Sequence, residues 1–287
     1  GLCYPPTIKV IYLEALENGA IEYEGFPTEV VQGGWDFAGE NFGNDANPID
    51  QYYQYESWNG WVYPTGLGTK LASIVHQLAP GAAIHAYKVY NVDENRGRGP
   101  SLAQVVEALE HALDPNQDGD TSDHLDIALI DGAGAAGFYN PDGTASFTLN
   151  QHLLDKAAGL GLTVITDAGG LAQWSMYEEA TEKHRYWLSS NASVTSAISV
   201  GSVVEQDGQY RVSDFSPKGP VRGSQALKPE IVSLGEEQPV ALISQPLQNN
   251  AELTTDTLFV SETGSQFAAA RIAAAAAVIK SQFPTAG

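Results

Sequence analysis

Short, continuously apolar runs alternate with amphipathic stretches along most of this chain, and this alternation restricts the fold more than any other feature. The apolar runs lie at residues 8–13, 83–89, 126–131, 162–167 and 196–204. Helical spacing of apolar side chains is found at residues 69–78, 101–113 and 149–158, and an alanine-rich helix is predicted at 268–283. Strands that are apolar at every position, separated by helices, indicate a parallel sheet covered on both faces. We therefore predict an α/β fold.

The length of 287 residues allows one large domain or two small ones. No internal repeat or low-complexity linker divides the chain, so a single domain over residues 1–287 is predicted. Residues 37–66 are rich in Asn, Gly, Tyr and Trp and are predicted to form one long surface excursion. We expect no propeptide, no signal peptide and no transmembrane segment, because no apolar run approaches the ~20 residues that a membrane helix needs.

The chain is strongly acidic, with 14 Lys and Arg against 35 Asp and Glu and a formal net charge of −21. This balance argues against nucleic acid as a partner, because the protein lacks the positive charge needed to neutralise phosphates. It also argues against binding to an anionic membrane surface. The single cysteine, Cys3, excludes a disulfide within the chain.

An acidic segment follows the predicted helix at 101–113 and has the spacing of a calcium loop. Oxygen-bearing side chains recur at positions 1, 3, 5, 7 and 10 of this segment, with glycine at position 6, and are Asp114, Asn116, Asp118, Asp120 and Asp123. Position 12 is Leu125 instead of the usual glutamate, although Asp126 is available as a substitute. Two interpretations stay open, a Ca²⁺ site and a surface turn without metal.

Several segments, in the right order, resemble motifs of the subtilisin-like serine proteases (subtilases, peptidase S8). The segments are 33–37 (GGWDF), 68–75 (GTKLASIV), 78–89 (LAPGAAIHAYKV), 114–120 (DPNQDGD), 214–220 (DFSPKGP), 227–231 (LKPEI) and 264–280 (GSQFAAARIAAAAAVIK). The resemblance spans nearly the whole chain and is greatest to the large secreted branch of the family. It implies a three-layer sandwich with a mainly parallel seven-stranded sheet, and a secreted or extracellular location.

The resemblance also identifies the positions where the family carries its catalytic groups, and these positions have changed. The aspartate position reads Glu14, the histidine position Leu67, the oxyanion-hole asparagine Gly170 and the nucleophile Gln266. Leucine cannot transfer a proton and glutamine is not a usable nucleophile. Loss of the asparagine alone removes about 3–4 kcal/mol of transition-state stabilisation. No catalytic set is intact, which favours a protein that is not an enzyme.

A shift of the alignment by one residue would make Ser265 the nucleophile. We reject this shift because the following residues match the family helix without a gap, and because it leaves Leu67 and Gly170 unexplained.

Subtilases bind substrate as an added strand beside two segments that follow neighbouring strands. The matching positions here are predicted to bind peptide and are Asp131, Gly132, Ala133, Gly134, Asp167, Ala168 and Gly169. Aspartates 131 and 167 stand where the family has small residues. Two nearby carboxylates repel unless a cation joins them, which suggests a site for a Lys or Arg side chain or for a metal. The alternative is that one aspartate caps a helix and the other faces solvent.

We therefore expect a catalytically inactive subtilisin-like domain that binds a peptide or protein and forms part of a secreted protein. One alternative is a hydrolase whose site is rebuilt from Glu14, Asp131, Asp167 or Ser265. The other is a purely structural module. The sequence leaves the oligomeric state open.

Overall fold

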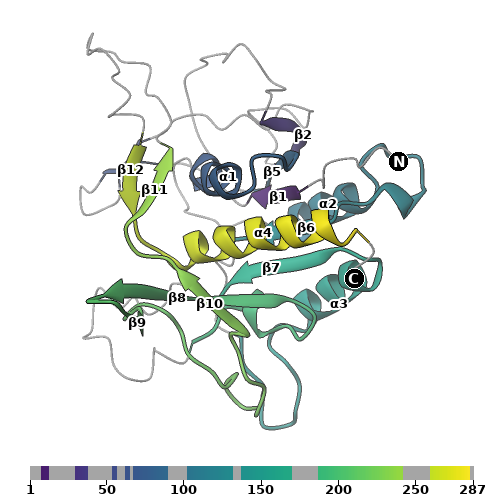
Figure 1. Cartoon of the computed structure of the whole chain (residues 1–287). Coiled ribbons are helices and arrows are strands. Elements are labelled where there is room, and N and C mark those ends of the chain that lie inside the picture. Colours follow the sequence, from purple (N-terminus) through teal and green to yellow (C-terminus); the bar gives the residue numbers. More distant parts are fainter. Residues whose placement is uncertain are drawn as a thin grey trace.

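The structure is a computed structural model. It describes residues 8–12, 30–37, 54–56, 62–64, 67–89, 102–131, 137–169, 187–241 and 259–284. Figure 1 follows the chain through these elements.

In the described part of the chain, the central sheet has eight strands, in the order β10-β8-β7-β6-β1-β5-β2 with β9 attached to β8. All neighbours along this order pair in parallel, whereas β9 runs antiparallel to β8. The strands are β1 (Ile8–Tyr12), β2 (Val31–Asp36), β5 (Ile84–Lys88), β6 (Ile127–Ile130), β7 (Thr163–Asp167), β8 (Ile198–Gln206), β9 (Gln209–Val212) and β10 (Ile231–Leu234). The predicted α/β fold is confirmed. A mainly parallel sheet of seven strands was expected, and the antiparallel β9 adds an eighth strand and makes the described sheet mixed.

Two antiparallel ribbons lie outside the central sheet. One joins β3 (Gln54–Glu56) to β4 (Val62–Pro64), and the other joins β11 (Gln238–Ala241) to β12 (Phe259–Glu262). The first ribbon falls within the predicted surface excursion at 37–66. Phe37, at the start of that segment, is a buried core residue. Apart from Phe37 and the two strands of the ribbon, most of the segment lies outside the described residues.

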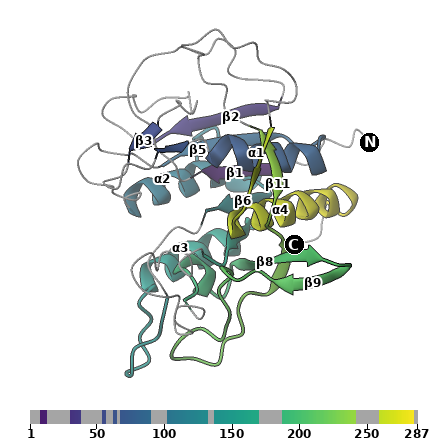
Figure 2. The same cartoon turned by 90° about the vertical axis from the view of Figure 1, so that its left-hand side faces the viewer.

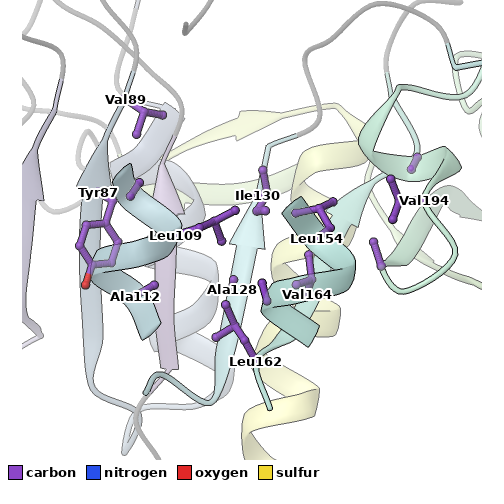
Figure 3. Close-up of a cluster of buried hydrophobic side chains, with 14 of the residues drawn as sticks. Tyr87, Val89, Leu109, Ala112, Ala128, Ile130, Leu154, Leu162, Val164 and Val194 are labelled. Atoms are coloured by element: carbon purple, nitrogen blue, oxygen red, sulfur yellow. The ribbon is translucent and has the colours of Figure 1, made fainter. Parts of the chain in front are cut away.

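Four α-helices of the described residues cover the two faces of the sheet. Figure 2 shows α1 (Leu67–Leu78) and α4 (Ser265–Gln282) on one side, and α2 (Leu102–Leu113) and α3 (Thr148–Gly159) on the other. The side chains of β6 alternate between these layers. Ile127 and Leu129 belong to the core under α1 and α4, whereas Ala128 and Ile130 belong to the core under α2 and α3. In Figure 3, the side chains of Leu109 on α2 and Leu154 on α3 lie on either side of Ile130 on β6.

Helix α4 packs against both α1 and the sheet because its inner face carries small side chains. Ala270, Ala273, Ala274 and Ala277 recur at helical spacing and are almost completely buried. Alanine also has the highest intrinsic helix propensity, so the same residues favour the helix and its close approach. None of the helices that the structure describes is long and apolar enough to span a membrane.

Candidate functional site

The start of α4 lies against the end of β7, and this contact joins parts of the chain that are far apart in sequence. The hydroxyl Oγ of Ser265 lies 2.8 Å from Oδ2 of Asp167 and 3.0 Å from the carbonyl oxygen of Gly169. Asp167 Oδ2 also accepts a hydrogen bond from the backbone N–H of Gly169, at 2.9 Å. These contacts hold the first residue of α4 on the loop that follows β7.

The local backbone explains why these residues meet. The carboxylate of Asp167 bonds the N–H two residues further on, which is the turn that aspartate commonly forms after a strand. Gly169 has φ +106°, a conformation that residues with a side chain rarely adopt. A negative charge beside the N-terminus of a helix is stabilised by the helix dipole, so the position of Asp167 is favourable for α4.

Ser265 and Asp167 are both buried, with 1% and 3% of their surfaces exposed. A hydroxyl group donates only one hydrogen, and both neighbours of Oγ are acceptors. Within the described residues, the hydrogen bonds of Ser265 Oγ are made with these oxygens and with no imidazole. Ser265 therefore acts as a donor that fixes the helix start.

Of the four altered catalytic positions, two are described. Leu67 is the first residue of α1 and packs, half-buried, at the edge of the core under α1 and α4. Gln266 is the second residue of α4 and is also half-buried. Glu14 and Gly170 lie outside the described residues.

An ion pair that the sequence did not predict joins α1 to β12. The ammonium group of Lys70, on the first turn of α1, contacts the carboxylate of Glu262 at the end of β12. Lys70 is buried, and in the family pattern this position is a second histidine. Because β12 leads directly into α4, the pair ties the start of α1 to the segment before Ser265.

The two aspartates predicted to bind peptide follow neighbouring strands, as expected. The β6–β7 ladder pairs Ile130 with Thr166. Asp131 and Asp167 each come one residue later, so they lie side by side at the carboxyl ends of the two strands. Both are buried, and the carboxylate of Asp167 is directed towards Ser265 and Gly169. Ala168 is also buried, and its N–H bonds the carbonyl of Val200. Gly132, Ala133 and Gly134 lie outside the described residues.

In the predicted calcium loop, side-chain oxygens accept hydrogen bonds from the loop's own backbone. Asp114 accepts from the N–H groups of Asp118 and Gly119, and Asp118 accepts from that of Asp120. Two hydrogen bonds from Ser122 lower the pKa of Asp120. Among the described residues, no group of three or more His, Cys, Asp or Glu side chains converges in a way that could hold a metal. Ca²⁺ binding by Asp114, Asn116, Asp118, Asp120 and Asp123 stays a prediction.

A mainly parallel sheet covered by helices on both faces, with the start of α4 held at the end of the central strand β7, defines a three-layer α/β protein. The chain belongs to the subtilase family, whose model (Peptidase S8) matches residues 40–287. No curated protein matches the sequence.

Solved structures of subtilisin-like proteases share this fold. "S41 Psychrophilic Protease" is 20% identical, with a TM-score of 0.60, over 98% of this chain and 79% of that one. Sphericase is 19% identical, with a TM-score of 0.60, over 99% and 80% of the two chains. The epidermin leader peptide processing serine protease of Staphylococcus aureus is 13% identical, with a TM-score of 0.61, over 97% and 66%.

Proposed function

We propose that this subtilase domain is catalytically inactive and binds a peptide or protein partner, as part of a secreted protein. The observation that carries the proposal is the environment of Ser265, the first residue of α4. Ser265 is only 1% exposed and its Oγ lies between two hydrogen-bond acceptors, so the hydroxyl is neither accessible to a substrate nor paired with an imidazole in the described residues.

The neighbouring positions support the same conclusion. Nucleophilic attack by serine needs a base that removes its proton and donors that stabilise the oxyanion. In the family pattern the nucleophile position is Gln266 and the histidine position is Leu67, and neither side chain can perform its step. A domain that keeps the sheet and the helix start without these groups retains surfaces for binding rather than for bond cleavage.

The binding part of the proposal rests on the carboxyl ends of β6 and β7. Ligands of open parallel sheets bind beyond the carboxyl ends of the strands, and Asp131 lies there beside Asp167. A negative site on a protein of net charge −21 favours a basic peptide. We propose that Asp131 contributes to this site, together with the glycines that follow it.

The first test measures proteolysis and active-site labelling. The purified protein is incubated with casein and with a mixed fluorogenic peptide library, with Ca²⁺ or a chelator, and separately with a serine-directed fluorophosphonate. We expect no cleavage and no covalent adduct in any condition. A stoichiometric adduct on Ser265 that disappears in Ser265→Ala would overturn the proposal.

The second test measures binding by fluorescence anisotropy with labelled Lys- and Arg-containing peptides. We expect Asp131→Asn to abolish binding, and Asp207→Asn, in an exposed turn, to leave it unchanged. If no peptide binds, the domain is a purely structural module.

One observation favours the alternative of a rebuilt hydrolase. The 2.8 Å contact between Ser265 Oγ and Asp167 Oδ2 has the geometry in which a carboxylate acts as a base. Cleavage that is lost in both Ser265→Ala and Asp167→Asn would support this alternative, whereas cleavage that is lost only with a chelator would indicate a metal-assisted site.

A further inference from the structure

A pocket of about 280 Å³ lies on the α2 side of the sheet, away from the start of α4. It is lined by Phe37, Glu107, Glu110, His111, Asp114 and Gln117. Phe37 and Leu109 of α2 belong to the core on the α2 and α3 face, whereas α4 packs on the opposite face. The pocket is therefore separate from the site discussed above.

The inner wall of this pocket is aromatic and held in place. The ring of His111 contacts Trp35, Phe37 and Tyr87, with ring centroids 5.4, 6.0 and 5.2 Å away. The Tyr87 hydroxyl lies 3.1 Å from Nδ1 of His111, and burial raises the pKa of Tyr87, so this phenol stays protonated. The N–H of Phe37 bonds the carbonyl of Lys88 in the neighbouring strand. These contacts fix the rings before any ligand arrives.

The outer wall is acidic. Glu107, Glu110 and Asp114 follow one another at spacings of three and four residues, which places them on one face of α2 and its C-terminal end. Asp114 is engaged by the N–H groups of Asp118 and Gly119. Neither Glu107 nor Glu110 takes part in an ion pair or side-chain hydrogen bond within the described part of the chain. Two like charges so close together repel each other, and a cation between them removes this repulsion.

The pocket is better suited to an organic cation than to a metal ion. The carboxylates do not converge on a common point within the described residues, as metal ligands must. An ammonium or guanidinium group instead binds carboxylates at its edge while its face or methylene groups lie on aromatic rings. The volume is just below the range of small-molecule pockets and so suits a single side chain.

We propose that this pocket binds the side chain of an arginine or lysine presented by a peptide or protein partner. Glu107 and Glu110 bind the cationic group, and Phe37 and His111 contact the rest of the side chain. The net charge of −21 attracts basic partners over a distance and so increases the rate of encounter.

The test uses Nα-acetyl-arginine amide as the probe and its neutral isostere Nα-acetyl-citrulline amide as the matched ligand, both titrated by NMR. We expect Glu107→Gln combined with Glu110→Gln to weaken binding of the arginine probe roughly tenfold or more, because it removes charge-assisted hydrogen bonds. The wild type is expected to bind the citrulline probe roughly tenfold or more weakly than the arginine probe.

The control protein carries Glu205→Gln and Glu237→Gln, which remove the same charge from exposed positions outside the pocket. It should bind the arginine probe within about twofold of the wild type, because exposed distant charges contribute little. Equal affinity of the pocket variant and the wild type, equal affinity for the two probes, or no binding at tens of millimolar would each overturn the proposal.

The outcome is independent of the proposed peptide site. Asp131→Asn leaves arginine binding unchanged if the pocket holds the probe, and abolishes it if the probe binds beside β6 instead.

Discussion

The hydroxyl group of Ser265 is a single polar group that links the first residue of α4 to the end of β7. It donates to the buried carboxylate of Asp167, and a buried acceptor that loses its donor costs about 1–3 kcal/mol. We expect Ser265→Ala to lower the free energy of unfolding by this amount, measured by urea denaturation followed by circular dichroism.

A second serine of the same helix supplies the control. Ser281 Oγ donates to the carbonyl of Val278 and accepts a long hydrogen bond from the side chain of Gln282, at a half-buried position near the end of α4. Ser281→Ala should change the stability by no more than about 0.5 kcal/mol. Equal effects of the two substitutions would mean that the Ser265 contact does not stabilise the helix start.

The sequence identified the residues of this contact but not the contact itself. Asp167 was noticed because the family has a small residue there, and Ser265 because it stands beside Gln266. The hydrogen bond joins residues that are 98 positions apart, and no local pattern reports such a distance. The ion pair of Lys70 and Glu262 also joins residues that are far apart in sequence. Its one sign in the sequence is a lysine on the side of a helix that is otherwise apolar.

Among the secondary structure elements, those with a strong period were predicted well. The helix at 69–78 is α1, Leu67–Leu78, with Leu71, Ile74 and Val75 buried as expected. The helical spacing of apolar residues continues to Leu78, but this side chain is exposed because α1 ends there.

The strand β9, which was not predicted, has no apolar period to reveal it. All residues of β9 are exposed, so its sequence carries no buried face. A turn signal did exist, since Asp207 and Gly208 both have positive φ and an Asp-Gly pair is typical of a tight hairpin. The ladder with β9 also explains why β8 extends to Gln206, beyond the predicted end at 204.

The loop after α2 gives a prediction at the scale of an element. Its Asp114 and Asp118 already accept backbone hydrogen bonds in the way that orders a loop before a cation binds. If the loop binds Ca²⁺, millimolar calcium should raise the melting temperature, because a ligand that binds only the folded state stabilises it.

The melting temperature in calcium is compared with that in sodium chloride of equal ionic strength. In the variant Asp118→Asn, calcium should raise the melting temperature by less than in the wild type. No shift with calcium, or the same shift in Asp118→Asn, would count against a calcium site in this loop.

For the whole molecule, the dominant quantity is the net charge of −21. Charges of one sign repel each other across the folded protein, and this repulsion extends about 30 Å at 0.01 M salt but only about 8 Å at 0.15 M. We expect the melting temperature to rise between these two concentrations of sodium chloride, by about 2–4 °C for each 1 kcal/mol of repulsion that is screened.

A variant with Glu205→Gln and Glu237→Gln carries less charge and should show a smaller rise. A melting temperature that is constant or falls with salt would mean that local ion pairs, such as the buried pair of Lys88 and Asp36, outweigh the overall repulsion.

The ion pair of Lys70 and Glu262 also bears on how this domain can evolve. Replacing Glu262 alone leaves the buried ammonium group of Lys70 without its counter-charge, which costs about 3–5 kcal/mol. Replacing Lys70 alone by the histidine of the family pattern leaves Glu262 with a shorter and weaker partner. Substitution of either residue alone therefore passes through a less stable protein, and positions 70 and 262 are expected to change together in related sequences.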